Sequence, residues 1–231
     1  MNFIVSSCRI VPGCVWLNRE VYFESTREPF DMNSFFSSVY EHIGIDYRRF
    51  YKMDALSKLG FLASEILLAG SDREQPKPDT GIILFNKNSS LEADMNYQKT
   101  IQHKDDFFPS PTEFVYTLPN IVAGEIAIRN KIYGETAFYV LRRFYSDTIN
   151  DVIDDALHVG GIKCALGGWI NVDIPKNAVD GFMMLCASMP LKFANNGFTP
   201  CLPAGLKGVR TGNIDFLTYS DIIDLYRNFK I

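Results

Sequence analysis

Short apolar segments alternate along this chain with longer stretches whose apolar residues recur at helical spacing. From Met32 the apolar positions follow at i, i+3, i+4, i+7, i+8 and i+11, which predicts a helix capped by Asp31. Further helices are predicted over 54–69, 118–130, 146–160 and 219–229, the last capped by Ser220 or Asp221. Strands are predicted over 3–5, 81–85, 136–141, 162–169 and 182–186. This alternation favours βαβ units, so we expect one α/β domain with a mostly parallel or mixed five-stranded sheet and helices on both faces.

Composition excludes several classes of function. The 231 residues are 47% hydrophobic and 22% charged, with a formal net charge of −4, and contain no run of basic residues. This balance is typical of a globular protein and predicts no nucleic-acid partner. The five cysteines and three histidines lack metal-ligand spacing, so we expect neither a metal nor another cofactor. No apolar run reaches membrane-spanning length and no leader pattern opens the chain, which predicts a cytoplasmic protein without a membrane partner.

The middle of the chain carries a family resemblance. Its landmarks are Leu-Pro-Asn-Ile-Val-Ala-Gly at 118–124, Ile126, Ile128, Gly134, the strand 136–141, the helix from Ser146, and Ala-Leu-Gly-Gly at 165–168. In type and spacing they resemble the segment around the catalytic cysteine of β-ketoacyl synthases. The resemblance implies that 1–231 is a β-ketoacyl synthase N-terminal-like domain, a single thiolase-like half, with 199–231 as an irregular loop plus a C-terminal helix.

The position of the family's nucleophile is occupied by an arginine. In the resembled enzymes a cysteine thiolate lies where a strand turns into a helix, and the helix dipole and backbone N–H groups activate it. Here that position is Arg143, flanked by Arg142 and Phe144. Arginine stays protonated and is not a nucleophile. The family's catalytic histidines are also missing, since no histidine follows Gly168. We therefore predict no catalytic residue and no unaided condensation, while other chemistry stays open.

The arginine pair has two interpretations. Arg142 and Arg143 suit an anion, such as a phosphopantetheine phosphate or the acidic face of an acyl carrier protein. A cation is unfavourable at a helix N-terminus, however, so the side chains are also expected to turn away and pair with Asp147, Asp151 or another carboxylate. We favour this second interpretation.

Other candidate motifs have structural explanations. Ser146 and Asp147 are expected at the N-cap of their helix, and His158 lies three turns away, so a hydrolase arrangement is not supported. The glycines at 167–168 and 205–212 lack the accompanying residues of a phosphate loop and indicate close backbone packing. The four aspartates of the helix 146–160 lie mainly on its polar side and indicate a solvated face rather than a metal site.

By resemblance, the first functional hypothesis is a non-catalytic subunit, similar to a chain-length factor, in fatty-acid or polyketide-type biosynthesis. Family members pair through the strand before the nucleophile, here 136–141, whose Phe138, Tyr139 and Val140 are apolar and suited to pairing. We expect a homodimer or a heterodimer with a ketosynthase. The alternatives are an acyl transferase or thioesterase on a reduced thiolase-like scaffold, and a binding partner of an acyl carrier protein.

Overall fold

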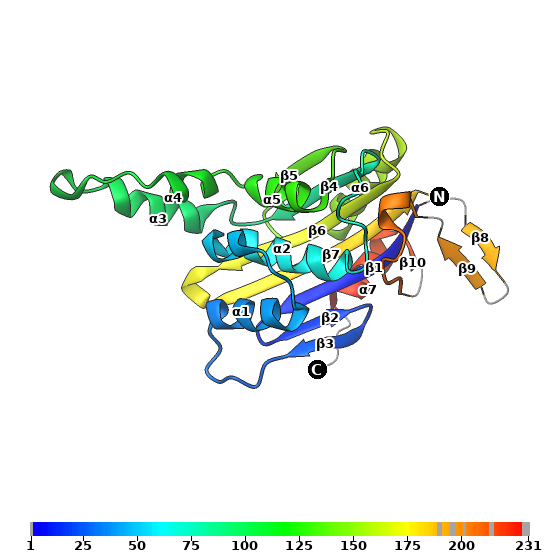
Figure 1. Cartoon of the computed structure of the whole chain (residues 1–231), viewed down its shortest axis with the longest axis horizontal. Coiled ribbons are helices and arrows are strands. Elements are labelled where there is room, and N and C mark those ends of the chain that lie inside the picture. The colour runs from blue at the N-terminus through cyan, green and yellow to red at the C-terminus, as the bar shows by residue number, and fades with distance from the viewer. Residues whose placement is uncertain (1, 189–190, 195–196, 201, 213–214, 228–231) are drawn as a thin grey trace.

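The structure is a computed structural model that describes residues 2–188, 191–194, 197–200, 202–212 and 215–227. Within these residues, eight strands form one mixed sheet in the order β3-β2-β1-β7-β6-β4-β5, with β10 also paired to β1 (Figure 1). Its strands are β1 (Asn2–Val11), β2 (Cys14–Leu17), β3 (Glu20–Glu24), β4 (Thr80–Asn86), β5 (Thr136–Val140), β6 (Cys164–Asp173), β7 (Ala178–Ser188) and β10 (Asp215–Phe216). A separate pair is formed by β8 (Leu191–Ala194) and β9 (Gly197–Pro200).

Seven α-helices and four short 3-10 helices complete the described chain. They are α1 (Met32–Ile43), α2 (Ala55–Leu67), α3 (Leu91–Ile101), α4 (Pro111–Tyr116), α5 (Ile121–Asn130), α6 (Ser146–His158), α7 (Tyr219–Arg227), η1 (Arg48–Lys52), η2 (Lys104–Asp106), η3 (Ile174–Lys176) and η4 (Ala204–Leu206). Asp31 caps α1 as predicted, because its carboxylate accepts from Ser34 N at 2.8 Å. Among the residues described, no helix is long and apolar enough to cross a membrane.

The predicted α/β class is confirmed, but the predicted count of five strands is wrong. The strands of the N-terminal hairpin, β2 and β3, were missed, and β10 is a two-residue strand. Only β5, β4 and β6 run parallel; every other pairing in the sheet is antiparallel. The β6–β7 ladder is antiparallel because η3 and Asn177, with φ 46°, turn the chain straight back.

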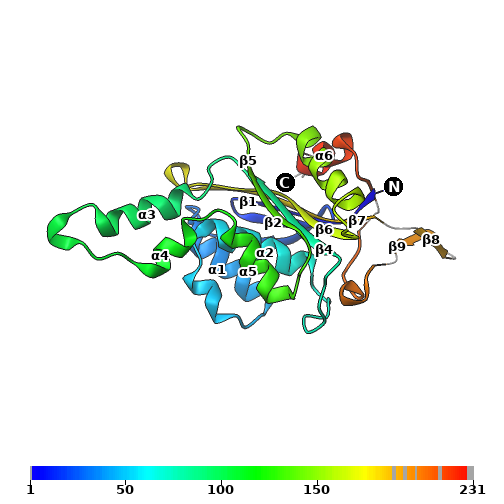
Figure 2. The same ribbon diagram turned by 90° about the horizontal axis from the view of Figure 1, so that it is seen from above.

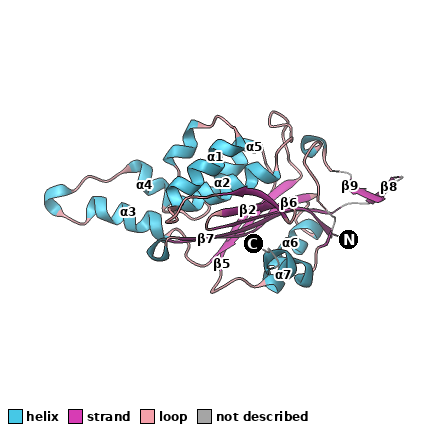
Figure 3. Cartoon of the chain, turned by 90° about the horizontal axis from the view of Figure 1, so that it is seen from below, coloured by secondary structure: helices cyan, strands magenta, loops and turns pink. Residues whose placement is uncertain are grey.

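The sheet separates two hydrophobic cores. On one face α1, α2 and α5 bury residues such as Phe36 and Phe61, and on the other α6 and α7 bury Ile153 and Ile222 (Figures 2 and 3). Helix α6 packs closely on β6 at Gly167, since a Cβ atom at this position would collide with the side chain of Ile153. The predicted interpretation of this glycine pair as close packing is therefore confirmed.

An arm formed by α3, η2 and α4 projects from one end of the molecule (Figures 1 and 2). It is inserted between β4 and α5, beyond the end of β4. No helix or strand is predicted from the sequence over 91–116, so the arm is a feature that sequence reasoning missed.

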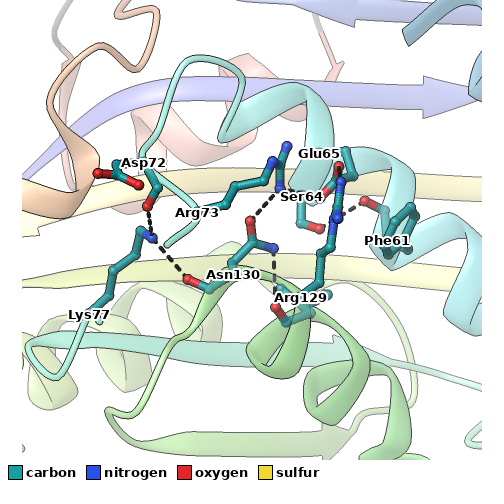
Figure 4. Close-up of polar contacts among 9 residues, drawn as sticks. Phe61, Ser64, Glu65, Asp72, Arg73, Lys77, Arg129 and Asn130 are labelled. Carbon is teal, nitrogen blue, oxygen red and sulfur yellow. Dashed lines mark hydrogen bonds and ion pairs between the residues drawn. The ribbon is translucent and has the colours of Figure 1, made fainter. Parts of the chain in front are cut away.

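Buried charges join α2, α5 and the segment between α2 and β4 (Figure 4). Glu65 is fully buried, and Arg73 Nη1 donates to its Oε1 at 2.7 Å and to Asn130 Oδ1 at 2.7 Å. Nη2 of Arg129 lies 3.6 Å from Glu65 Oε2. The Lys77 ammonium donates to three backbone carbonyls, including that of Asn130 at 2.9 Å. Since these cations are held by the chain's own oxygens, the cluster has a structural role.

We predict that Glu65→Ala lowers the free energy of unfolding by about 3 kcal/mol or more, because Arg73 and Arg129 then lose their buried counter-charge. Urea unfolding measures the loss. Glu74→Ala is the matched control, since the Glu74 carboxylate is 88% exposed in its pair with Lys131 and should contribute little. Equal unfolding curves for the two variants would contradict the structural role of Glu65.

Candidate functional site

The turn 142–145 connects β5 to α6 at the carboxyl end of β4. Leu141 N extends the ladder by donating to Asn86 O at 2.7 Å, and the chain then leaves the sheet to begin α6 at Ser146. Carboxyl ends of adjacent parallel strands are where α/β folds place functional groups. The predicted strand and helix on either side of Arg143 are present as β5 and α6.

The N-terminus of α6 differs from the prediction. Tyr145 occupies the N-cap position in an extended conformation and provides no side-chain cap. Ser146 is the first helical residue, and Asp147 accepts a hydrogen bond from Thr148 N at 2.8 Å. The predicted N-cap at Ser146 or Asp147 is therefore wrong, although the Asp147 carboxylate lies in the first turn, where it complements the helix dipole.

Arg142 and Arg143 are both exposed. The Arg143 guanidinium lies over the ring of Tyr145, 4.9 Å from its centroid. Among the described side chains, neither arginine forms an ion pair with Asp147 or Asp151, so the predicted pairing with these two aspartates is wrong, whereas the exposure of both arginines agrees with side chains that turn away. The turn thus presents at Arg143, the predicted nucleophile-equivalent position, a solvated cation stacked on Tyr145.

Phe144, next along the turn, packs inward instead. Its ring stacks on Tyr226 of α7 at 3.8 Å between centroids, with 6° between the planes. It also meets Trp169 of β6 and Phe182 of β7 edge-on, at 6.1 and 6.2 Å. Because aromatic rings fill the space beneath the turn, the apolar core continues up to the junction between the sheet and α6.

A carboxylate on β7 contacts the C-terminal helix beside this aromatic group. Asp180 Oδ2 accepts from the Tyr226 hydroxyl at 2.7 Å and from Trp169 Nε1 at 3.0 Å, and its Oδ1 lies 2.7 Å from Arg9 Nη1. The Arg9 guanidinium also lies over the Tyr226 ring, 4.5 Å from its centroid. Burial, followed by the nearby Asp180 carboxylate, raises the pKa of Tyr226 well above its ordinary value, so the phenol remains a donor.

Sequence reasoning missed this group, because its members come from β1, β6, β7 and α7. The one available signal was the amphipathic pattern that predicted a last helix. That helix is present as α7, but it is capped by Thr218, whose Oγ1 accepts from Asp221 N at 3.2 Å, and not by Ser220 or Asp221. The predicted end of the helix at residue 229 lies outside the described residues.

A hollow of about 530 Å³ opens between the turn and α7. The residues that line it include Arg143, Arg227 and Asp147. The hollow therefore offers two cations and one anion beside the N-terminus of α6.

The described cysteines are unsuited to nucleophilic chemistry. Cys8, Cys164 and Cys186 are fully buried, and burial raises the pKa of each thiol, to about 12 for Cys164. Burial also raises the pKa of Cys14, whereas Cys201 lies outside the described residues. A thiol must ionise to react, so none of these four buried thiols is activated. Within the described part of the chain, no group of three or more His, Cys, Asp or Glu is placed to hold a metal.

The strand with the predicted pairing residues lies at the end of the sheet. β5 pairs only with β4 among the described strands, which leaves its other edge open. Tyr139 stacks on Phe85 at 5.2 Å and is 39% exposed, Val140 is 54% exposed, and Phe138 is half-buried against the larger core. β3, at the opposite end, has exposed Glu20 and Glu24, whereas β5 has no charged residue.

Comparisons with known proteins identify the fold. No protein-family model matches the sequence, and no curated protein is similar to it. Among solved structures, the ishigamide ketosynthase/chain length factor is similar, with a TM-score of 0.59 and 15% identity over 81% of this chain. A ketosynthase, ApeO, in complex with its chain length factor, ApeC, from Xenorhabdus doucetiae has a TM-score of 0.52 and 13% identity, covering 81% of this chain and 79% of that one.

A third similar structure is a type II polyketide synthase acyl-carrier protein in complex with its ketosynthase, AntDE:AntF, with a TM-score of 0.51 and 11% identity over 80% of this chain. The chain spans 62% of the length of the matched chains in this structure and in the ishigamide structure. These likenesses confirm the predicted ketosynthase-like fold.

We predict that Tyr226→Phe lowers the free energy of unfolding by about 1–2 kcal/mol, because Asp180 loses a hydrogen-bond donor within the covered aromatic group. Tyr133→Phe removes a hydroxyl from a side chain that is 68% exposed and should leave stability unchanged. Urea unfolding of both variants measures the difference. If Tyr226→Phe were as stable as the wild type, Asp180 would not be the group that fixes α7.

Proposed function

We propose that this chain is a non-catalytic ketosynthase-like subunit that pairs with a second subunit of the ketosynthase fold and contributes shape, rather than a nucleophile, to polyketide-type or fatty-acid-type assembly. The observation that carries the proposal is the strand-to-helix junction. There Arg143 is solvated and stacked on Tyr145, while Phe144 fills the space beneath the turn. A guanidinium remains protonated and cannot accept an acyl group.

The alternative of an acyl transferase or thioesterase requires an activated nucleophile. Cys164, the nearest cysteine in sequence, is buried in β6 with a raised pKa. Ser146 and His158 stand at opposite ends of the 13-residue α6, about 18 Å apart along the axis, so the histidine cannot act as a base for that serine. Nothing in the described residues favours an acyl transferase or thioesterase over a non-catalytic subunit.

Pairing through β5 is supported by the contrast between the two ends of the sheet. An open strand edge exposes backbone donors and acceptors that attract another strand, and proteins commonly protect such edges with charges. The β3 edge exposes Val21 but also carries Glu20 and Glu24, whereas the β5 edge exposes Tyr139 and Val140 without a charged residue. An uncharged edge with apolar side chains fits an edge that is covered in the assembled protein.

An acyl carrier protein is a second proposed partner. Carrier proteins are acidic and bring their acyl group on a phosphodiester-linked arm. Arg143 and Arg227 face one hollow, and Arg142 is exposed beside it. Cations in this arrangement would recognise an acidic surface or a phosphate through charge-assisted hydrogen bonds.

We predict that the purified chain forms no covalent acyl adduct with acyl-carrier or coenzyme A thioesters and does not elongate them. Cys8, Cys164 and Cys186 should also resist alkylation by iodoacetamide until the protein is unfolded, because their thiols are buried and protonated. Peptide mass spectrometry before and after denaturation measures the acylation and the alkylation of each cysteine. Turnover of a thioester, or an acyl group on any cysteine of the native chain, would contradict the proposal.

We predict that Tyr139→Lys abolishes pairing through β5, because an exposed lysine on this edge would oppose an approaching apolar strand. Light scattering coupled to size-exclusion chromatography should detect monomer or aggregate. It is to be applied to the chain alone and to the chain co-expressed with each ketosynthase of the same organism. Tyr51→Lys, at a side chain that is 62% exposed in η1, is the control. An unchanged complex of the Tyr139 variant would refute the β5 geometry.

A further inference from the structure

The arm leaves the body of the molecule with few apolar side chains buried by its helices, as Figures 2 and 3 show from opposite sides. Ala93 is the one residue of α3 that is buried, and Tyr116 is the one residue of α4. The Ser90 hydroxyl donates to Thr117 O at 2.6 Å, which closes the two ends of the arm against each other. Because elements with few buried apolar contacts open most easily, any polar contact between α3 and the body has a large effect on the arm.

Two acidic side chains lie where the base of the arm meets the first turn of α2. Asp54 is the N-cap of α2 and accepts from Ser57 N at 3.0 Å. Glu92, in the first turn of α3, faces the backbone N–H of Ala55, the first residue of α2. Both acidic side chains line one cleft, which also contains apolar side chains from α2, α3 and β6. The start of α2 therefore holds one carboxyl group of the body and one of the arm.

The positive charge around this pair is too small for two carboxylates. The N-terminus of a helix is equivalent to about half a positive charge, which favours a single carboxylate there. Lys58 of α2 acts on both carboxyl groups, but its ammonium lies over the Phe50 ring, 5.9 Å from the centroid. Glu113 of α4 adds a further negative charge. Where β6 runs into η3, the charges of Asp173 and Lys176 pair with each other at 2.9 Å.

The remaining ionisable neighbours do not supply a proton to the pair. Burial, followed by the nearby Glu125 and Asp54 carboxylates, raises the pKa of Tyr116 to about 12, so the phenol stays neutral while carboxyl groups titrate. Its hydroxyl is directed at Glu125 Oε1 at 3.5 Å, and Arg49 Nη2 lies 3.1 Å from the same oxygen. The charge on Asp54 and Glu92 is therefore left to the pair itself.

One oxygen of the pair lacks a donor. Glu92 Oε2 is buried and accepts no hydrogen bond from the described residues. A buried carboxylate oxygen without a donor is costly, whereas a protonated carboxyl group carries a donor of its own. Burial raises the pKa of both side chains, and the Asp54 carboxylate raises the pKa of Glu92 further. The docked pair therefore retains a proton to a higher pH than an exposed carboxyl group does.

We propose that Asp54 and Glu92 form a proton-dependent latch between α2 and the arm, which holds the arm while the pair retains one proton and loosens when both carboxyl groups are ionised. The latch belongs to this chain by itself and does not depend on the proposed function. Because the docked arm binds the proton more tightly than the open arm, docking is strongest at acidic pH. It weakens as the pH rises from the ordinary carboxyl range, about 4, through the raised pKa of the pair, and then stays constant.

Hydrogen exchange of the α3 amides, corrected for the intrinsic exchange rate and measured from about pH 4 to about pH 8, tests the latch. In the wild type the opening constant should rise by up to about tenfold per pH unit, the limit for release of one proton, and then level off. Glu92→Gln and Asp54→Asn each leave a single carboxyl group, and asparagine can still cap α2. Both variants should therefore show a smaller rise that ends at a lower pH.

Two control variants of the arm should keep the wild-type profile. Asp94→Asn neutralises an exposed carboxylate in the same turn of α3 as Glu92, and His103→Gln removes the histidine of the arm. An altered profile in either control assigns the pH dependence to other groups and overturns the proposal.

The other outcomes are equally decisive, because the readout is the pH profile and not stability alone. A wild-type opening constant that does not change with pH overturns the latch. A wild-type profile in Glu92→Gln or in Asp54→Asn shows that the two carboxyl groups do not act as a pair, which also overturns it. A variant that opens more at every pH but keeps the wild-type rise has lost only a structural contact, and this result contradicts the latch. None of these outcomes bears on pairing through β5.

Discussion

The Asp180 carboxylate determines how one face of the sheet is closed. It holds Tyr226 of α7, Trp169 of β6 and Arg9 of β1 together, so three elements far apart in sequence share one acceptor. A partly buried carboxylate is favourable when donors and a cation lie against it. The Tyr226 hydroxyl and Trp169 Nε1 both donate to Asp180 Oδ2, and α7 lies over the aromatic rings, with Phe144 enclosed between the sheet and the last helix.

The closed face has a direct consequence for the junction between β5 and α6. In a ketosynthase-like site this junction needs an open approach for a substrate and a residue that can ionise. Here the inward space is filled by Phe144 against Tyr226, and the outward position is a permanent cation. The filled space and the permanent charge therefore each support the proposed non-catalytic role, independently of the other.

Sequence reasoning succeeded where the signal was local. The helix from Met32 has an apolar stripe and an aspartate cap, and the strand 81–85 is an uninterrupted apolar run, so both could be identified from neighbouring residues. The hairpin of β2 and β3 was missed because its turn uses Asn18 and Arg19 with positive φ, and arginine is not a residue that signals such a turn. Asp180 could not be assigned from sequence, since its partners lie up to 171 residues away along the chain.

The presence of Arg143 just before α6 costs the fold little. A cation near the positive end of a helix is unfavourable, by up to about 1 kcal/mol at an exposed site. Arg143 avoids most of this cost because its guanidinium is solvated and rests on the Tyr145 ring, and Asp147 supplies a negative charge in the first turn of α6. The strand, turn and helix are thus compatible with an arginine at this position. Because the backbone geometry of a junction and the chemistry of its side chains are separable, the fold alone does not fix what this junction does.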